Sequence, residues 1–221
     1  MKALVAAAAI MAAAFSAEAR LPREEPSQHW LERSAMFHRE GVAPGSVVFL
    51  GDSQTEGGDW AALTGIPDAV NRGIIGDTAE GIADRLSDVT AGQPAKIFLL
   101  CGVNDVSHQI PADSVAMGIT DLIRRIHTES PSTKIYLQSL LPINNSFGRY
   151  KRIAGKESTI REINTLLEAE AQSLGVTWIN LYPLFTDPQG NLRADLTTDG
   201  LHLKPEGYAI WGAIIKPYAT E

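Results

Sequence analysis

Short, mainly hydrophobic runs alternate along this chain with longer segments in which hydrophobic side chains recur every three or four residues. The short runs lie at 47–50, 69–71, 96–101, 134–140 and 176–180. The longer segments lie at 78–89, 114–127, 157–174 and 205–218. Alternation of strand-like with helix-like segments predicts a parallel sheet with helices on both faces. We therefore expect an α/β fold, a flavodoxin-like three-layer α/β/α sandwich with a five-stranded parallel sheet.

The N-terminal residues have the pattern of an export signal. Lys2 precedes an apolar stretch at 3–15, and Ala17-Glu18-Ala19 is a small-x-small cleavage site. The apolar stretch is short for a membrane span, although an uncleaved anchor remains the alternative. We predict a signal peptide at 1–19, a linker and an amphipathic helix at 20–44, and one globular domain at 45–221. The mature protein would then be secreted or periplasmic.

Composition narrows the choice of partners. The chain has 221 residues, of which 44% are hydrophobic, and a net charge of −7. This acidic balance does not resemble a basic nucleic-acid surface, so no nucleic-acid partner is expected. Cys101 is the single cysteine, which excludes an intrachain disulfide, and its place in an apolar run predicts a buried, inert thiol. The oligomeric state is left open by the sequence.

The first short run leads into the turn Gly51-Asp52-Ser53. A buried strand that ends in such a turn can present a serine hydroxyl at the carboxyl edge of a parallel sheet, where ligands bind in folds of this kind. Ser53 is therefore a candidate nucleophile. Gly-Asp-Ser is also ordinary turn and helix-cap chemistry, so this stretch alone does not decide between the two interpretations.

Other strand ends and the C-terminal turn carry the groups that serine chemistry requires. A serine hydroxyl needs a base, for which His202 is the candidate, and Asp199 three residues earlier can hold the other ring nitrogen. A developing oxyanion needs fixed hydrogen-bond donors. The backbone N–H groups of Ser53 and Gly73 and the side-chain amide of Asn104 are the candidates. Each residue taken singly could instead belong to a turn, a cap or the surface.

Other site chemistries lack their motifs. The sequence contains neither Gly-x-x-x-x-Gly-Lys-Ser/Thr nor Gly-x-Gly-x-x-Gly, which argues against a phosphate or nucleotide binder. No His/Asp cluster has metal-ligand spacing, so no metal and no cofactor is expected. The Gly-x-Ser-x-Gly elbow of α/β-hydrolases is absent too, because Thr55 occupies its last position.

Four sequence blocks, taken in order, resemble the SGNH (GDSL-type) hydrolases, and the resemblance extends over about 47–218. The blocks are Gly51-Asp52-Ser53, Asn71-Arg72-Gly73, Gly102-Val103-Asn104-Asp105 and Asp199-Gly200-Leu201-His202. The resemblance implies the SGNH hydrolase fold, a nucleophilic Ser53, an Asp199–His202 pair, and oxyanion donors at Ser53, Gly73 and Asn104.

Within that family, the first two blocks look most like the platelet-activating-factor acetylhydrolase branch. Gln54 replaces the leucine of the family name, and Ile75 stands where that branch often has glycine. This resemblance, the short chain and the polar, basic stretch 142–156 together favour a serine esterase for short acyl groups, acetyl above all, acting on carbohydrate or other small polar esters. A lysophospholipase or thioesterase, and a non-catalytic carbohydrate-binding module on the same fold, remain the alternatives. The polar, basic stretch 142–156 follows a strand end and is either a solvated loop or a substrate-contacting one.

Overall fold

The computed structural model describes residues 25–221, so the predicted signal peptide lies outside the described residues. Five strands form one parallel sheet in the order β2-β1-β3-β4-β5. They are β1 (Val47–Gly51), β2 (Val70–Gly73), β3 (Lys96–Leu100), β4 (Lys134–Gln138) and β5 (Thr177–Ile179). This strand order is that of flavodoxin-like sheets, and it confirms the predicted fold class.

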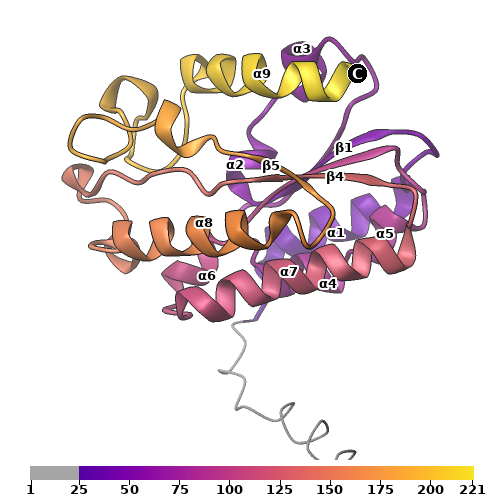
Figure 1. Ribbon diagram of the computed structural model, residues 1–221, viewed down its shortest axis with the longest axis horizontal. Helices are drawn as coiled ribbons and strands as arrows, with labels where there is room; N and C mark the ends of the chain where they lie inside the picture. The colour runs from indigo at the N-terminus through magenta and orange to yellow at the C-terminus, as the bar shows by residue number, and fades with distance from the viewer. Residues whose placement is uncertain (1–24) are drawn as a thin grey trace, which may run out of the picture.

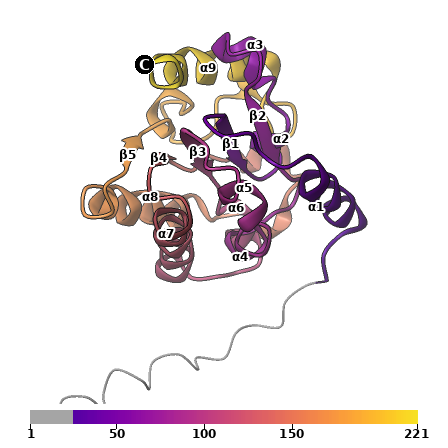
Figure 2. The same cartoon turned by 90° about the vertical axis from the view of Figure 1, so that its right-hand side faces the viewer.

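Helices cover both faces of the sheet (Figure 1). One face carries α4 (Ala79–Asp84), α5 (Ser87–Thr90), α7 (Ala112–Glu129) and α8 (Glu157–Ala171). The other carries α3 (Trp60–Thr64) and α9 (Pro205–Thr220). The predicted N-terminal helix is α1 (Gln28–Glu40), which lies at the side of the sheet nearest β2 (Figure 2). Two short helices, α2 (Ser53–Glu56) and α6 (Val103–Ser107), begin just beyond β1 and β3.

The side chains of each strand alternate between two cores, as the pleat requires. Aliphatic side chains point toward α4, α7 and α8, and they include Val48, Leu50, Ile97, Leu99, Ile135 and Leu137. Aromatic side chains fill the opposite core under α3 and α9. There Phe49 stacks between Trp60 and Phe98, with ring centroids 4.4 and 4.9 Å away, and Phe98 stacks on Tyr136 at 4.6 Å. The two cores fix the strands whose ends carry the candidate site.

The segment 78–89 is interrupted, although its periodicity predicts one helix. The chain leaves α4 at Arg85, whose side chain is 2% exposed and points inward. The Arg85 guanidinium donates to the carboxylate of Asp77 and to the backbone carbonyls of Gly51 and Arg72. Buried carbonyl and carboxylate oxygens require hydrogen-bond donors. Because the Arg85 side chain turns inward to supply them, α4 ends at this residue.

Strand β4 is shorter than its hydrophobic pattern predicts. The side chain of Asn164 accepts from Leu140 N at 2.8 Å and donates to Leu140 O at 3.0 Å. Because these backbone groups are satisfied by an amide side chain from α8, the sheet does not continue to Leu140. The chain departs from the sheet here and enters the segment 142–156.

Candidate active site

Ser53 lies at the tip of a tight turn between β1 and α2. The side chain of Asp52 caps α2 by accepting the Gln54 N–H at 3.0 Å. Only glycine fits at position 51 of this turn, because a Cβ there would lie 2.2 Å from Leu100 O. Ser53 is the first residue of α2, so its N–H has no intrahelical acceptor. The turn therefore presents both the hydroxyl and the N–H of Ser53 at the carboxyl edge of the sheet.

The structure brings together the three predicted triad residues. Ser53 Oγ lies 2.9 Å from His202 Nε2, and His202 Nδ1 lies 2.8 Å from Asp199 Oδ2. The Asp199 carboxylate selects the tautomer in which Nδ1 carries the proton, so Nε2 accepts from the serine hydroxyl. Asp199 Oδ1 accepts the N–H groups of Leu201 (3.0 Å) and His202 (2.8 Å), which fixes the turn.

These hydrogen bonds keep Asp199 ionised. Partial burial acts to raise the pKa of Asp199, but the bonds from the His202 ring, from two backbone N–H groups and from Tyr150 outweigh it. The pKa of Asp199 is therefore held well below its usual range. A carboxylate that stays charged can stabilise an imidazolium beside it.

Tyr150 is a contact of the triad that the sequence did not reveal. Its hydroxyl donates to Asp199 Oδ2 at 2.9 Å and lies 3.1 Å from His202 Nδ1. Tyr150 belongs to the segment 142–156, so this segment reaches the triad and is more than a solvated loop. A tyrosine in a polar loop has no periodicity or spacing that would have marked it as a contact of the triad.

Gln54 links the serine turn to the histidine turn. Its Nε2 donates to Leu201 O at 3.0 Å, and its backbone carbonyl accepts the Tyr208 hydroxyl at 2.8 Å. Gln54 is 2% exposed. A glutamine amide can form this hydrogen bond and a leucine side chain cannot. The glutamine that replaces the leucine of the GDSL motif therefore has a structural role.

Of the predicted oxyanion donors, Asn104 can still donate a hydrogen bond to a substrate, whereas Gly73 cannot. Asn104, in the first turn of α6, donates one amide hydrogen to Asp77 O at 2.8 Å, and the amide carries a second. The prediction for Gly73 is wrong, because its N–H donates to Asn71 Oδ1 at 2.9 Å. A Cβ at Gly73 would lie 2.2 Å from Glu56 N, so this glycine lets β2 and α2 approach.

Gly76 has no catalytic role in the sequence-based prediction, but it lies beside Asn104 in the fold. It has a φ of 81° and precedes Asp77, whose carbonyl binds Asn104. Gly76 and Asn104 line the same cavity of about 650 Å³. Other walls of this cavity come from Trp30, Ile75, Ser107, His108 and Arg152. Asn104 is the predicted site residue that lines this cavity, whereas Ser53, Asp199 and His202 are not among its lining residues.

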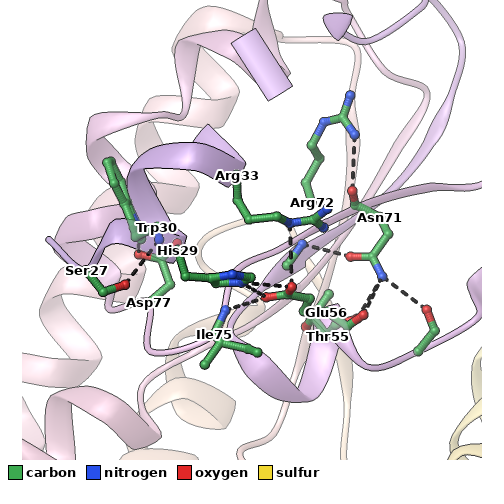
Figure 3. A network of polar contacts seen from close by, with 12 residues as sticks. Ser27, His29, Trp30, Arg33, Thr55, Glu56, Asn71, Arg72, Ile75 and Asp77 are labelled. Atoms are coloured by element: carbon green, nitrogen blue, oxygen red, sulfur yellow. Dashed lines mark hydrogen bonds and ion pairs between the residues drawn. The ribbon is translucent and has the colours of Figure 1, made fainter. Parts of the chain in front are cut away.

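The backbone between β2 and α4, residues 74–78, is called the oxyanion loop below. Figure 3 shows how α1 and α2 hold it. Glu56 Oε2 accepts the Ile75 N–H at 2.6 Å. The same carboxylate lies 3.0 Å from His29 Nε2 and 3.5 Å from Arg33 Nε, both on α1. Glu56 thus connects α1 to the loop from the helix that carries Ser53.

A second carboxylate holds the other end of the oxyanion loop. Asp77 Oδ1 accepts the Trp30 indole N–H at 2.9 Å (Figure 3), and Asp77 Oδ2 pairs with Arg85 at 2.7 Å. Burial acts to raise the pKa of Asp77, and the Arg85 charge opposes that effect. The loop is therefore fixed at Ile75 and at Asp77, with Gly76 between the two anchors.

Two further buried carboxyl groups, those of Asp52 and Asp105, are sequence neighbours of Ser53 and Asn104. Burial raises the pKa of Asp52 and the pKa of Asp105 to about 7 each. Asp105 accepts the Ala79 N–H, whereas Asp52 Oδ2 has no hydrogen-bond partner within residues 25–221. Cys101 is buried as predicted, and burial raises the pKa of its thiol, which makes a reactive thiolate unfavourable.

The described part of the chain offers neither a metal cluster nor a membrane-spanning helix. Within residues 25–221, no group of three or more His, Cys, Asp or Glu is placed to hold a metal ion. None of the helices in that same range has the length and hydrophobicity needed to cross a bilayer.

A three-layer α/β/α sandwich with a Ser–His–Asp hydrogen-bond chain at the carboxyl edge of its sheet defines the protein as a serine hydrolase of carboxylic esters. The profile of the GDSL-like Lipase/Acylhydrolase family matches residues 49–210. The chain therefore belongs to this family, as its four sequence blocks predicted.

Known proteins similar to this chain agree with that membership. Platelet-activating factor acetylhydrolase IB subunit alpha2 of Rattus norvegicus is 29% identical over 170 residues, which are 74% of this chain and 71% of that protein. A GDSL-like lipase from Bacteroides thetaiotaomicron superposes with a TM-score of 0.75 at 26% identity, over 85% of this chain and 96% of that one. An acetyl xylan esterase shares the fold, with a TM-score of 0.65 at 22% identity, over 78% and 98% of the two chains.

Proposed function

We propose that this protein is a secreted serine esterase that removes short acyl groups, acetyl above all, from a carbohydrate or another small polar alcohol. The hydrogen-bond chain Ser53–His202–Asp199 carries the catalytic part of the proposal. A non-catalytic carbohydrate-binding module on this fold would have no need of all three groups in hydrogen-bonding order.

In the proposed reaction, Ser53 Oγ attacks the ester carbonyl carbon while His202 Nε2 takes the hydroxyl proton. The C–O bond to the alcohol then breaks, and His202 returns the proton to the departing alkoxide oxygen, which leaves an acyl-enzyme on Ser53. Water, deprotonated by His202, attacks the acyl carbon. The bond between that carbon and Ser53 Oγ then breaks, His202 returns the proton to Ser53 Oγ, and the carboxylic acid leaves. Asp199 remains ionised throughout and stabilises the imidazolium in both halves.

The negative charge that develops on the carbonyl oxygen needs hydrogen-bond donors close to Ser53. The Ser53 N–H and the second amide hydrogen of Asn104 are two such donors. We assign the third role, first given to Gly73, to the N–H of Gly76. Gly76 lies on the oxyanion loop that Asn104 contacts, and its φ of 81° suits glycine.

Three observations support a short acyl group and a polar alcohol. The similar rat protein is an acetylhydrolase by name. Polar side chains from several elements line the cavity beside Asn104. The loop 142–156, which reaches His202 through Tyr150, carries Arg149 and Lys151. Because His202 must protonate the leaving alcohol, the loop beside it is placed to contact that half of the substrate.

A lysophospholipase is the second candidate, and two exposed apolar side chains favour it. Ile75 is 54% exposed on the oxyanion loop, and Phe147 is 39% exposed on the loop that carries Tyr150. Apolar side chains at the rim of the site would suit a lipid tail.

A series of p-nitrophenyl esters from acetate to palmitate separates the two candidates. A closed acyl site excludes long chains sterically, whereas an open apolar groove gains about 0.8 kcal/mol for each buried CH₂. We expect kcat/KM to peak at acetate or butyrate and to collapse by octanoate. A maximum at octanoate or beyond would exclude the acetylesterase and favour the lysophospholipase.

The secreted location rests on the sequence pattern of 1–19. N-terminal sequencing of the protein recovered outside the cytoplasm tests it, and the expected first residue is Arg20. Recovery of an uncleaved, membrane-bound chain would contradict it.

A further inference from the structure

We propose that Tyr150 is a positioning residue of the triad, whose hydroxyl holds the Asp199–His202 pair in register and shares the Asp199 carboxylate with the imidazole. This inference rests on the proposed esterase function and extends it to a side chain from the loop 142–156. Tyr150 acts through Asp199 and His202, and it is assigned no contact with the reacting atoms.

The three groups form a closed triangle. Tyr150 Oη lies 2.9 Å from Asp199 Oδ2 and 3.1 Å from His202 Nδ1, and these two atoms lie 2.8 Å apart. The phenol donates to the carboxylate, and the Nδ1–H points at the same oxygen, Oδ2. The phenol and imidazole rings also pack edge to face, with centroids 5.6 Å apart and an interplanar angle of 69°. Tyr150 thus restrains the imidazole ring by both a polar and an apolar contact.

The loop would keep its place without the Tyr150 hydroxyl. Asn144 N donates to Gly200 O at 2.8 Å, and Asn144 Nδ2 donates to Leu192 O at 2.8 Å. A Cβ at Gly200 would lie 2.2 Å from Asn144 O, which shows how closely the loop and the histidine turn approach. Removing one phenol oxygen should therefore leave the fold and the loop intact. This makes Tyr150→Phe a test of the hydroxyl alone.

The charged and titratable groups that face His202 define the expected sign of the effect. They are Asp199 from its own turn and Tyr150 from the loop, with Ser53 on the side of Nε2 and Arg149 next to Tyr150. Burial and the neighbouring Asp199 charge raise the pKa of Tyr150, so its hydroxyl remains a protonated donor. A donor on Oδ2 withdraws negative charge from the oxygen that would stabilise the imidazolium. Without that donor, the imidazolium becomes easier to form.

The experiment compares the wild-type protein, Tyr150→Phe and Tyr182→Phe, with p-nitrophenyl acetate as substrate from pH 4 to pH 9. Tyr182 is a matched control, because its hydroxyl donates to Gly190 O and is not a hydrogen-bond partner of Ser53, Asp199 or His202. For Tyr150→Phe we expect the acid midpoint of kcat/KM to move up by about half a pH unit or more. We also expect the plateau kcat to fall by roughly 2- to 10-fold while KM changes little.

A Tyr150→Phe profile that overlays that of the wild type, or an equal shift in Tyr182→Phe, would overturn the proposal. A purely structural role would lower the melting temperature and the plateau rate without moving the acid midpoint, and this result would overturn it as well. The NMR resonance of the His202 Nδ1 proton is a readout that does not need turnover. It should shift in Tyr150→Phe and not in Tyr182→Phe, and the reverse pattern would refute the contact even if the esterase function itself failed.

Discussion

Ser53, Asp199 and His202 were predictable as site residues because each lies in a short local motif at a strand end or a turn. Tyr150 was not, because its role depends on the path of the loop 142–156. Gly73 was assigned wrongly for a local reason. An asparagine side chain often accepts the N–H two residues further on, and Asn71 takes the Gly73 N–H in this way.

Asn104 provides the most direct test of the oxyanion donors. Asn104→Ala should lower kcat by roughly 10²-fold while KM changes little, because the amide meets charge that exists only near the transition state. Steady-state kinetics with p-nitrophenyl acetate give both constants, and Asn191→Ala serves as the control. If KM rises and kcat is unchanged, Asn104 binds substrate and is no oxyanion donor.

Asp52 should make the stability of the protein depend on pH. Burial raises its pKa to about 7, above a value of about 3.9 for the unfolded chain. A carboxyl of this kind stabilises the fold at pH values below its unfolded pKa, and this contribution is lost as the pH rises toward the folded pKa. The free energy of unfolding of the wild type should therefore fall, relative to Asp52→Asn, between about pH 4 and pH 7.

Urea unfolding at several pH values measures this difference. Asn can keep the cap on Gln54 N, so the substitution removes the titration and preserves the acceptor. The exposed Asp68→Asn is the control, and its stability should track that of the wild type at every pH. Parallel curves for the wild type and Asp52→Asn would contradict the raised pKa of Asp52.

The strands and the long helices were predictable from hydrophobic spacing, and their ends were less so. The helix predicted at 78–89 is interrupted because Arg85 donates hydrogen bonds to buried carbonyls at the ends of two strands. These carbonyls are distant in the sequence, so no local sequence signal marks the interruption. The helix α1 was predicted within 20–44, but its function was not. Its contacts with Glu56 and Asp77, through His29, Arg33 and Trp30, make it a support for the oxyanion loop.

Glu56→Ala tests this support. The Ile75 N–H would lose its acceptor and the oxyanion loop its link to α1, so we expect kcat to fall about 10-fold or more. Glu56→Gln can still accept from Ile75 N and should recover most of that loss. The exposed Glu32→Gln, on the same helix α1, is the control. Wild-type turnover in Glu56→Ala would show that the loop does not need this anchor.

At the scale of the whole molecule, the alternation of strands and helices was enough to predict the sheet and its three layers. Parallel strands place their carboxyl ends at one edge, so motifs far apart in the sequence could be expected to meet there. The cavity beside Asn104 was not predictable, because its walls come from α1, the oxyanion loop, α6 and Arg152. Such a surface depends on how loops from separate elements pack.

The identity of the nucleophile is the claim on which the rest depends, and hydrolysis of p-nitrophenyl acetate by Ser53→Ala tests it most directly. The variant should fold as the wild type does, with an unchanged circular dichroism spectrum, and its kcat should fall by about 10³-fold or more. Removal of the attacking oxygen leaves only the contributions of the oxyanion donors and of binding. Folded Ser53→Ala with turnover close to that of the wild type would contradict Ser53 as the nucleophile.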